Sequence, residues 1–299
     1  MSLPLLIALF AIGLGSGIDA IVKGVAPEAG LHHLLAWRFL FGGVIAFAVF
    51  RAQNRPAPSW EATRFHTFRG LIQLGGAFTF FYALMHLPLA VATIIGFTAA
   101  LMVPFLAWML MRERVSPVTL FATVIGFAGA ALAITGRPQS GAASDQWILG
   151  AISCFAAAFL YALMLVMLRM RATKEDATTI AMFTNVVPGI AMLPVTLGFF
   201  GAVDWADILI FLMLGTLGYV MWYLMTLAYA RAPAQRLAPL EYTALIWSGI
   251  FGSVFFAEYP GWQTWLGAAI IIGACLIVAF EERFVTRKET GLPVSDLPE

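Results

Sequence analysis

Three charged side chains lie well inside long apolar stretches of the sequence: Asp19, Arg38 and Glu241. A charge in hydrocarbon is costly, so such residues usually face a partner or a water-filled cavity and mark the path of a substrate, an ion or a proton. Asp19 lies near the C-terminal end of its apolar stretch and Arg38 near the N-terminal end of the next one. Both therefore lie at a similar depth from the same face of the membrane. They could form a structural ion pair that braces this end, or a gate that also contacts a charged group of a substrate.

Glu241 follows Pro239 about eight residues into its apolar stretch, which is roughly 12 Å deep at the helical rise. Proline removes a backbone hydrogen bond and tends to kink a helix. Broken helices near the middle of the membrane are where transporters bind their substrates. A carboxylate shielded from water also binds a proton more readily. Glu241 could therefore carry a proton or hold a cationic group, and a buried glutamate held by neighbouring hydroxyl groups is the alternative.

A second set of candidates consists of aromatic and polar side chains deep in the apolar stretches. They could stack on a planar ring or hold an organic cation through cation–π contacts. Ordinary helix packing is the alternative for each of them. The set is Tyr82, His86, Tyr161, Asn185, Trp222, Tyr223, Tyr242 and Trp247.

The sequence gives no sign of catalytic residues, a metal site or a cofactor site. It contains neither His-Glu-x-x-His nor Gly-x-Ser-x-Gly, and Cys154 and Cys275 are isolated in apolar runs, where we expect them to pack as small side chains. The net charge of +1 and the lack of a basic stripe argue against nucleic acid as a partner. A channel would need a ring of like charges or a filter loop. An intramembrane enzyme is kept only as a remote alternative.

The elements that position these residues must be membrane helices. Hydrophobic residues make up 61% of the chain and charged residues 11%, whereas soluble domains are roughly 45–50% apolar and about 25% charged. About 20 apolar residues cross the ~30 Å hydrocarbon core as a helix, and we predict an all-α integral membrane protein with ten transmembrane helices. The predicted spans are 3–23, 33–50, 70–87, 88–111, 117–136, 147–169, 177–200, 206–230, 233–256 and 262–281.

The second half of the sequence repeats the first. Gly70 aligns with Gly215 and Glu113 with Glu258, both pairs at a shift of 145 residues and without a gap between them. A unit of five spans must lie upside down relative to its copy, and inverted repeats are typical of secondary transporters. The predicted organisation is a first repeat at 1–136, an outer linker at 137–146, a second repeat at 147–281 and a cytoplasmic tail at 282–299.

Connections between the spans are expected to be short. Tight hairpins are predicted at Leu87–Pro88 and Ala232–Pro233, where proline can open the following helix. The segment 51–69 is predicted to be a polar loop with a short amphipathic piece.

For three charged residues near the ends of spans, we expect structural roles. Glu113 and Glu258 each stand just before a turn, so we expect them to close a loop or the next helix. Lys23 is expected to extend its ammonium group to the membrane interface.

The positions of lysine and arginine give the orientation. With the N-terminus in the cytoplasm, only Lys23 and Arg137 fall outside and Arg38 falls within a span, which leaves 14 of 17 on the cytoplasmic side. This bias follows the positive-inside rule. We predict a multi-pass protein of a bacterial-type inner (plasma) membrane with both termini cytoplasmic. Glycine and alanine in the spans 117–136 and 262–281 permit close helix approach, either within a monomer or against a second copy in a homodimer.

These residues together resemble the drug/metabolite transporter superfamily, in its ten-span members built from two EamA-type repeats. The resemblance covers nearly the whole chain and implies a central cavity between the halves and alternating access without ATP. A narrower similarity is to the S-adenosylmethionine-uptake and related organic-solute branch. The residues that match the repeats are Trp37-Arg38-Phe39, Leu87-Pro88, Pro104, Arg112-Glu113-Arg114, Pro233, Glu258-Tyr259-Pro260 and Gly267, and those of the narrower similarity are Asp19 with Lys23, Arg69-Gly70-Leu71 and Pro239-Leu240-Glu241-Tyr242.

The resulting expectation is a secondary active transporter or exchanger of a small organic metabolite, such as an amino acid, a nucleoside derivative or a vitamin-like compound. Its partners would be the lipid bilayer, the substrate and, if transport is proton-coupled through Glu241, protons. An amino-acid or drug exporter of the same family that works as a facilitator is the alternative.

Overall fold

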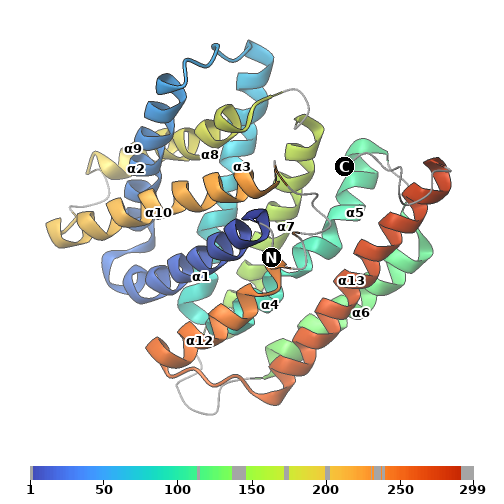
Figure 1. Ribbon diagram of the computed structural model, residues 1–299. Coiled ribbons are helices and arrows are strands. Elements are labelled where there is room, and N and C mark those ends of the chain that lie inside the picture. The colour runs from blue at the N-terminus through green and yellow to red at the C-terminus, as the bar shows by residue number, and fades with distance from the viewer. Residues whose placement is uncertain are drawn as a thin grey trace.

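The computed structural model describes residues 3–112, 115–136, 146–171, 175–198, 203–229, 231, 237 and 240–290. Within these ranges every regular element is a helix (Figure 1). The helices are α1 (Leu3–Ala29), α2 (Leu31–Ala52), α3 (Trp60–His86), α4 (Leu89–Gly96), α5 (Thr98–Met111), α6 (Pro117–Thr135), α7 (Trp147–Arg171), α8 (Ala177–Ala191), α9 (Leu193–Thr196), α10 (Trp205–Tyr229), α12 (Ala244–Phe256) and α13 (Trp262–Thr290).

Seven segments of the described chain are long and apolar enough to cross a membrane. They are Leu3–Ala29, Leu31–Ala52, Leu89–Met111, Pro117–Thr135, Trp147–Arg171, Trp205–Met225 and Trp262–Ala279. The prediction of an all-helical membrane protein is confirmed. The three other predicted spans fall on α3, which has charged residues in its first half, and on the shorter helices α8 and α12.

Several predicted boundaries are wrong because charged residues are accommodated inside the helices. The first helix continues past residue 23 to Ala29, and Gly30 with a φ of 82° turns the chain into α2. The predicted loop over 51–69 is helical from Trp60 onward, since the Ser59 hydroxyl caps α3 by accepting from the Ala62 amide at 3.2 Å. At the other end of the chain, the span Trp262–Ala279 agrees with the predicted span 262–281, and the helix α13 itself continues to Thr290.

The tight hairpin at Leu87–Pro88 is confirmed. The helix α3 ends at His86, Leu87 is extended, and Pro88 with a φ of −58° stands directly before the first residue of α4. Other predicted features lie outside the described residues, namely Glu113, Arg114, Pro239, the hairpin at Ala232–Pro233, residues 137–145 of the linker and 291–299 of the tail.

Helices at equivalent positions of the two halves pack on one another. At the 145-residue shift α2 corresponds to α8, α6 to α13, and the pair α4–α5 to α12, and each of these packs against its counterpart. The pairing of α6 with α13 is visible along one side of the molecule (Figure 1). The remaining contacts also come in equivalent pairs, since α3 packs on α7 as α10 packs on α1, and α3 packs on α8 as α10 packs on α2. The two halves therefore make equivalent sets of helix contacts.

The backbone repeats in the same way. Arg112 and Ala257, which are 145 residues apart, end α5 and α12 in the left-handed conformation with φ values of 59° and 51°. Phe97 interrupts the helix between α4 and α5, and its equivalent Tyr242 stands at the break before α12. Their rings meet edge to face with centroids 5.2 Å apart. The two halves therefore share one local structure and touch at an equivalent point.

The helices α6 and α13 approach each other closely. A Cβ atom added at Gly267 would lie 2.5 Å from the Gly129 carbonyl oxygen and 2.8 Å from Ala133. At Gly126 it would lie 3.2 Å from the Ala274 Cβ atom of α13 and 2.2 Å from Leu101 of α5. These small residues serve packing within the chain, one of the two alternatives that the sequence left open.

Candidate functional site

Asp19 on α1 and Arg38 on α2 lie near each other without direct contact. The two charges interact electrostatically, yet among the described residues no Asp19 oxygen lies within the 4.0 Å limit of an ion pair with Arg38. The Arg38 side chain is 8% exposed, and its guanidinium carbon lies 4.9 Å from the Phe81 ring centroid and 5.2 Å from that of Phe39. The structure therefore leaves a gap of more than 4.0 Å between the two opposite charges, whereas the sequence left open a structural ion pair or a gate that also contacts the substrate.

The guanidinium group of Arg38 also reaches the second half of the chain. A Cβ atom at Gly218 of α10 would lie 3.2 Å from the Arg38 Nη2 atom, so the glycine leaves room for the charged group. Arg38 thus lies where helices of both halves meet.

Glu241 lies at the helix break directly before α12. Tyr242 and Thr243 form a turn there, and the Thr243 hydroxyl donates to the Leu240 carbonyl at 2.6 Å. The carboxylate interacts electrostatically with Tyr242 and with Tyr161 of α7. The structure brings these three predicted residues together, and the edge-to-face contact with Phe97 places them against the matching break of the first half.

The helix α7 connects the two charged groups. Two residues of this helix interact electrostatically with these groups. Cys154 interacts with Asp19, and Tyr161 interacts with Glu241. Their separation of two helical turns corresponds to about 10 Å along the helix axis. Asp19 and Glu241 therefore interact with residues two turns apart on α7, and the Tyr161 side chain is 37% exposed.

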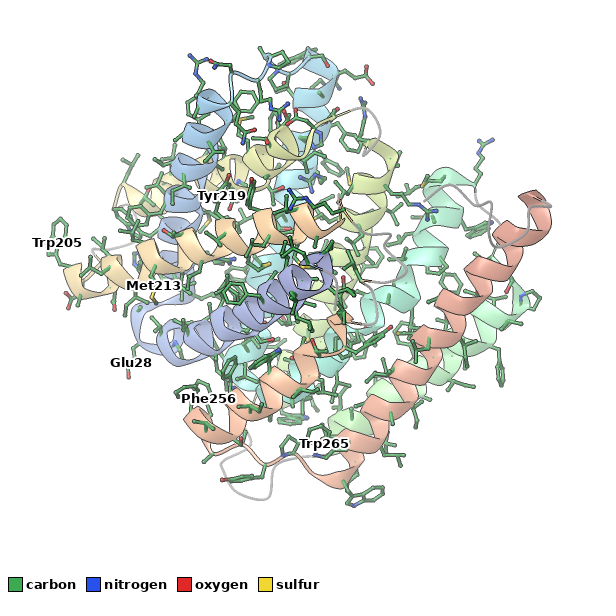
Figure 2. All side chains as sticks on the ribbon, in the orientation of Figure 1. Glu28, Trp205, Met213, Tyr219, Phe256 and Trp265 are labelled. Atoms are coloured by element: carbon green, nitrogen blue, oxygen red, sulfur yellow. The ribbon has the colours of Figure 1, made fainter. Side chains whose placement is uncertain are left out.

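Tyr82, His86 and Tyr223 are not part of this arrangement. The Tyr82 ring lies against His86 with centroids 4.6 Å apart, and its hydroxyl donates to Gln146 just before α7. Tyr223 is 44% exposed on α10 and stacks on Tyr219, which Figure 2 labels on the same helix. These side chains line the ends or the surface of the helices.

The two tryptophans pack against apolar neighbours. Trp222 lies against the buried cluster that includes Met164 and Met167 of α7. Trp247 of α12 covers Gly13 of α1, where an added Cβ atom would lie 3.2 Å from the indole ring. The Trp247 contact joins the two halves, whereas the contact of Trp222 with α7 lies within the second half, and both fit the packing alternative.

Asn185 is explained by helix packing. Its side-chain amide donates to the Ala181 carbonyl one turn earlier at 3.0 Å, and its oxygen would lie 2.9 Å from a Cβ atom at Gly42 of α2. The residue thus lies within the close contact of α2 and α8.

A polar cluster that the sequence interpretation missed joins Lys23 to Glu258. The Lys23 ammonium lies 3.0 Å from the Glu258 Oε1 atom and donates to the carbonyl oxygens of Leu84 at 2.8 Å and Leu87 at 2.5 Å. The other carboxylate oxygen of Glu258 accepts from the Leu89 amide at 2.8 Å. Lys23 therefore points into the protein, and the expectation that it extends to the membrane interface is wrong.

One signal in the sequence could have identified this cluster. Leu168 stands at the position equivalent to Lys23, so the lysine breaks the repeat in the same way as Asp19, Arg38 and Glu241. Glu258 does cap a helix, as expected, but the helix is α4 of the first half instead of the next helix in the chain.

A second missed cluster ties α3 to the connection between α7 and α8. His66 is fully buried and hydrogen-bonds Glu175, while Arg69 is 2% exposed and donates to the Thr184 hydroxyl at 2.5 Å. Arg171 lies 3.6 Å from the Glu175 carboxylate. Burial lowers the pKa of His66 below its usual value, against the opposing effect of Glu175. The sequence interpretation counted Arg171 only as a cytoplasmic charge, and it noted Arg69 as a cytoplasmic charge and as part of the resemblance to the narrower branch.

Among the described residues, no group of three or more His, Cys, Asp or Glu side chains is placed to hold a metal ion.

Comparisons with known proteins add a family likeness. The model of the EamA-like transporter family matches residues 2–135 and 148–280. The chain is 24% identical over 294 residues to the S-adenosylmethionine uptake transporter of Rickettsia bellii, covering 94% of this chain and 97% of that protein. It is 26% identical over 262 residues to the riboflavin transporter of Brucella anthropi, covering 84% and 88%. A crystal structure with 21% sequence identity has a TM-score of 0.62 and covers 94% of this chain and 98% of that chain, which describes the fold alone.

Proposed function

Because the chain belongs to the EamA-like transporter family, whose model matches both of its halves, we propose that it is a secondary transporter that moves a small organic metabolite by alternating access. It is a multi-pass membrane protein of a transporter family and not an enzyme. The substrate class, the topology and the coupling that follow are parts of the same proposal.

The observation that supports the substrate class is the gap between Asp19 and Arg38. Two opposite charges that are buried near each other without touching can each bind the complementary group of a zwitterion. An ammonium group would lie at Asp19 and a carboxylate at Arg38. Glu241 with Tyr161 and Tyr242, about 10 Å further along α7, would receive a cationic or ring-bearing part of the same molecule. The substrate is then a zwitterion with a second polar or aromatic end.

The names of the relatives supply probes for this class. S-adenosylmethionine has an amino-acid head group, a sulfonium cation and an adenine ring, so its groups match both ends of the proposed site. Riboflavin has a planar ring system but lacks a zwitterionic head group. If the charged gap selects the substrate, the first probe should bind and the second should bind more weakly.

The proposed topology is ten spans in two inverted five-helix repeats, with the first repeat at 1–136, an outer linker at 137–146, the second repeat at 147–281 and a cytoplasmic tail at 282–299. Its support is the packing of equivalent helices on one another and the shared backbone at Arg112 and Ala257. The lysine and arginine bias supports cytoplasmic termini in an inner membrane.

A binding measurement tests the proposed site. Purified protein in detergent is screened by thermal shift against amino acids, S-adenosylmethionine, riboflavin and organic cations. We expect a zwitterion to stabilise the wild type and to lose at least tenfold in affinity for Arg38→Met, with Trp60→Leu at an exposed position as the control. Stabilisation by zwitterions that persists in Arg38→Met, or stabilisation only by uncharged compounds, would contradict the proposed site.

A facilitator of the same family is the second candidate. Glu241 favours proton coupling, because a carboxylate in the membrane interior can take up and release a proton during transport. Flux that ignores an imposed pH gradient would favour the facilitator.

A further inference from the structure

The four segments around Lys23 and Glu258 come from both halves of the chain. Lys23 is on α1, Leu84 and Leu87 are at the end of α3, Leu89 opens α4, and Glu258 follows α12. Glu28 near the end of α1 and Phe256 at the end of α12 are labelled on the same side of the molecule (Figure 2). From these contacts we infer that the Lys23–Glu258 pair is a lock that holds this face of the transporter closed. The inference rests on the proposed alternating access, since only a protein that opens and closes needs a lock.

The Lys23–Glu258 pair binds the C-terminal end of α3 and the N-terminal end of α4. The Lys23 ammonium has three protons, and the Leu84 carbonyl, the Leu87 carbonyl and Glu258 take one each. A cation at the C-terminal end of α3 and an anion at the N-terminal end of α4 both agree with the helix dipoles. One ion pair therefore fixes the α3–α4 turn to α1 and α12 at once.

The chain around Glu258 is shaped to direct its carboxylate inward. Ala257 takes the left-handed conformation, and the Glu258 amide donates to the Gly252 carbonyl at 3.0 Å. A Cβ atom at Gly252 would lie 2.9 Å from the Glu258 Oε2 atom, so a larger residue there would require the carboxylate to shift from its present position. The side chains of Lys23 and Glu258 are 10% and 14% exposed, which limits screening by water.

The lysine of this pair has no equivalent in the repeat. In the repeat, Glu113 stands in the place of Glu258, but Leu168 stands in the place of Lys23. The repeat therefore lacks a lysine at the position from which Lys23 reaches Glu258. The pair therefore biases the resting protein toward a state closed at this face, which is the outer face in the proposed orientation.

The experiment measures opening of this face without a substrate. The probe is native Cys154, which is buried beside Asp19 in the interior, in a Cys275→Ala background. A charged, membrane-impermeant methanethiosulfonate is added to the outside of intact cells, and the rate of Cys154 modification is measured. We expect the rate to rise at least tenfold in Lys23→Met and in Glu258→Gln, and to rise no further in the double variant.

The controls separate the lock from general loosening. Glu258→Gln keeps the side-chain shape, and Lys23→Arg keeps the charge and should stay slow. Arg55→Met removes an exposed charge near Asp176 on another part of the chain and should match the background rate. Unchanged rates in both Lys23→Met and Glu258→Gln, with the protein folded by size-exclusion profile, would overturn the lock. An equal rise in Arg55→Met would also overturn it. The measurement needs no transported compound. The lock can therefore be disproved while the transport proposal stands, and the transport proposal can be disproved while the lock stands.

Discussion

The buried histidine of α3 makes the stability of the protein depend on pH. Burial holds the pKa of His66 below the ordinary value of 6.5, so the folded state keeps the ring neutral. Below about pH 6.5 the unfolded chain binds a proton that the folded state resists, and stability falls as the pH drops toward the folded pKa. One such group contributes at most ~1.4 kcal/mol per pH unit.

We therefore expect the melting temperature in detergent to decline between pH 7.5 and 5.5, and to decline less in His66→Gln. His32→Gln, at an exposed position, should retain the slope of the wild type. A slope in His66→Gln as steep as in the wild type would contradict this account of the buried cluster.

Glu241 carries the prediction for coupling. If its carboxylate takes up a proton during transport, Glu241→Gln should lose the dependence of uptake on an imposed pH gradient while exchange of substrate continues. The measurement is the initial rate of S-adenosylmethionine uptake into proteoliposomes with and without a gradient of one pH unit. A variant with the pH dependence of the wild type would exclude Glu241 as the proton site.

Single residues could be predicted from the sequence where a charge stands within a long apolar stretch. Asp19, Arg38 and Glu241 are conspicuous because each is a charge in an apolar run. Lys23 and Glu258 are not conspicuous, since each stands near the end of a span, where a charge is ordinary. Their pairing is a long-range contact that no local pattern encodes.

At the scale of elements, the close approach of α6 and α13 depends on glycine at particular positions. Gly267→Ala would place a methyl group 2.5 Å from the Gly129 carbonyl oxygen, and overpacking of this kind typically costs about 1–3 kcal/mol. Gly273→Ala on the same helix meets nothing within 4 Å and should be neutral or gain up to ~1 kcal/mol of helix propensity.

Thermal unfolding of the two variants side by side checks this contact. The two substitutions have equal propensity effects, so the difference between their melting temperatures isolates the steric contact. A Gly267→Ala protein as stable as Gly273→Ala would mean that α6 and α13 do not pack as described.

The elements themselves were predicted well where apolar runs are long and poorly where charges are buried. The ends of α1 and α3 were misplaced because polar residues were taken to lie in loops. Lys23 stays in α1 because Glu258 pairs with it, and α3 reaches back to Trp60 because Glu175 and Thr184 satisfy His66 and Arg69. Tertiary partners of this kind are absent from a hydropathy pattern.

At the scale of the whole molecule, the repeat predicts that equivalent residues lie on opposite sides of the membrane. Tyr259 and Arg114 are equivalent at the 145-residue shift. In a cysteine-free background, Tyr259→Cys should react with an impermeant maleimide in intact cells, and Arg114→Cys only after the cells are opened. Labelling of both from the same side would rule out inversion.

The overall architecture was the most predictable level, because duplication and charge bias are properties of the whole chain. The 145-residue shift anticipated which helices would be equivalent, and these equivalent helices pack on one another. The sequence could not show that Phe97 and Tyr242 meet at the contact between the halves, since that contact depends on how the two copies are placed.

The central claim is that this chain carries a zwitterionic metabolite across a membrane by alternating access. The most direct test is counterflow: proteoliposomes loaded with unlabelled S-adenosylmethionine are diluted into a trace of the labelled compound. The account predicts a transient accumulation of label above equilibrium that is at least tenfold smaller in Arg38→Met. Label that never exceeds the level in protein-free liposomes, for this probe and for every zwitterion that stabilises the purified protein, would contradict it.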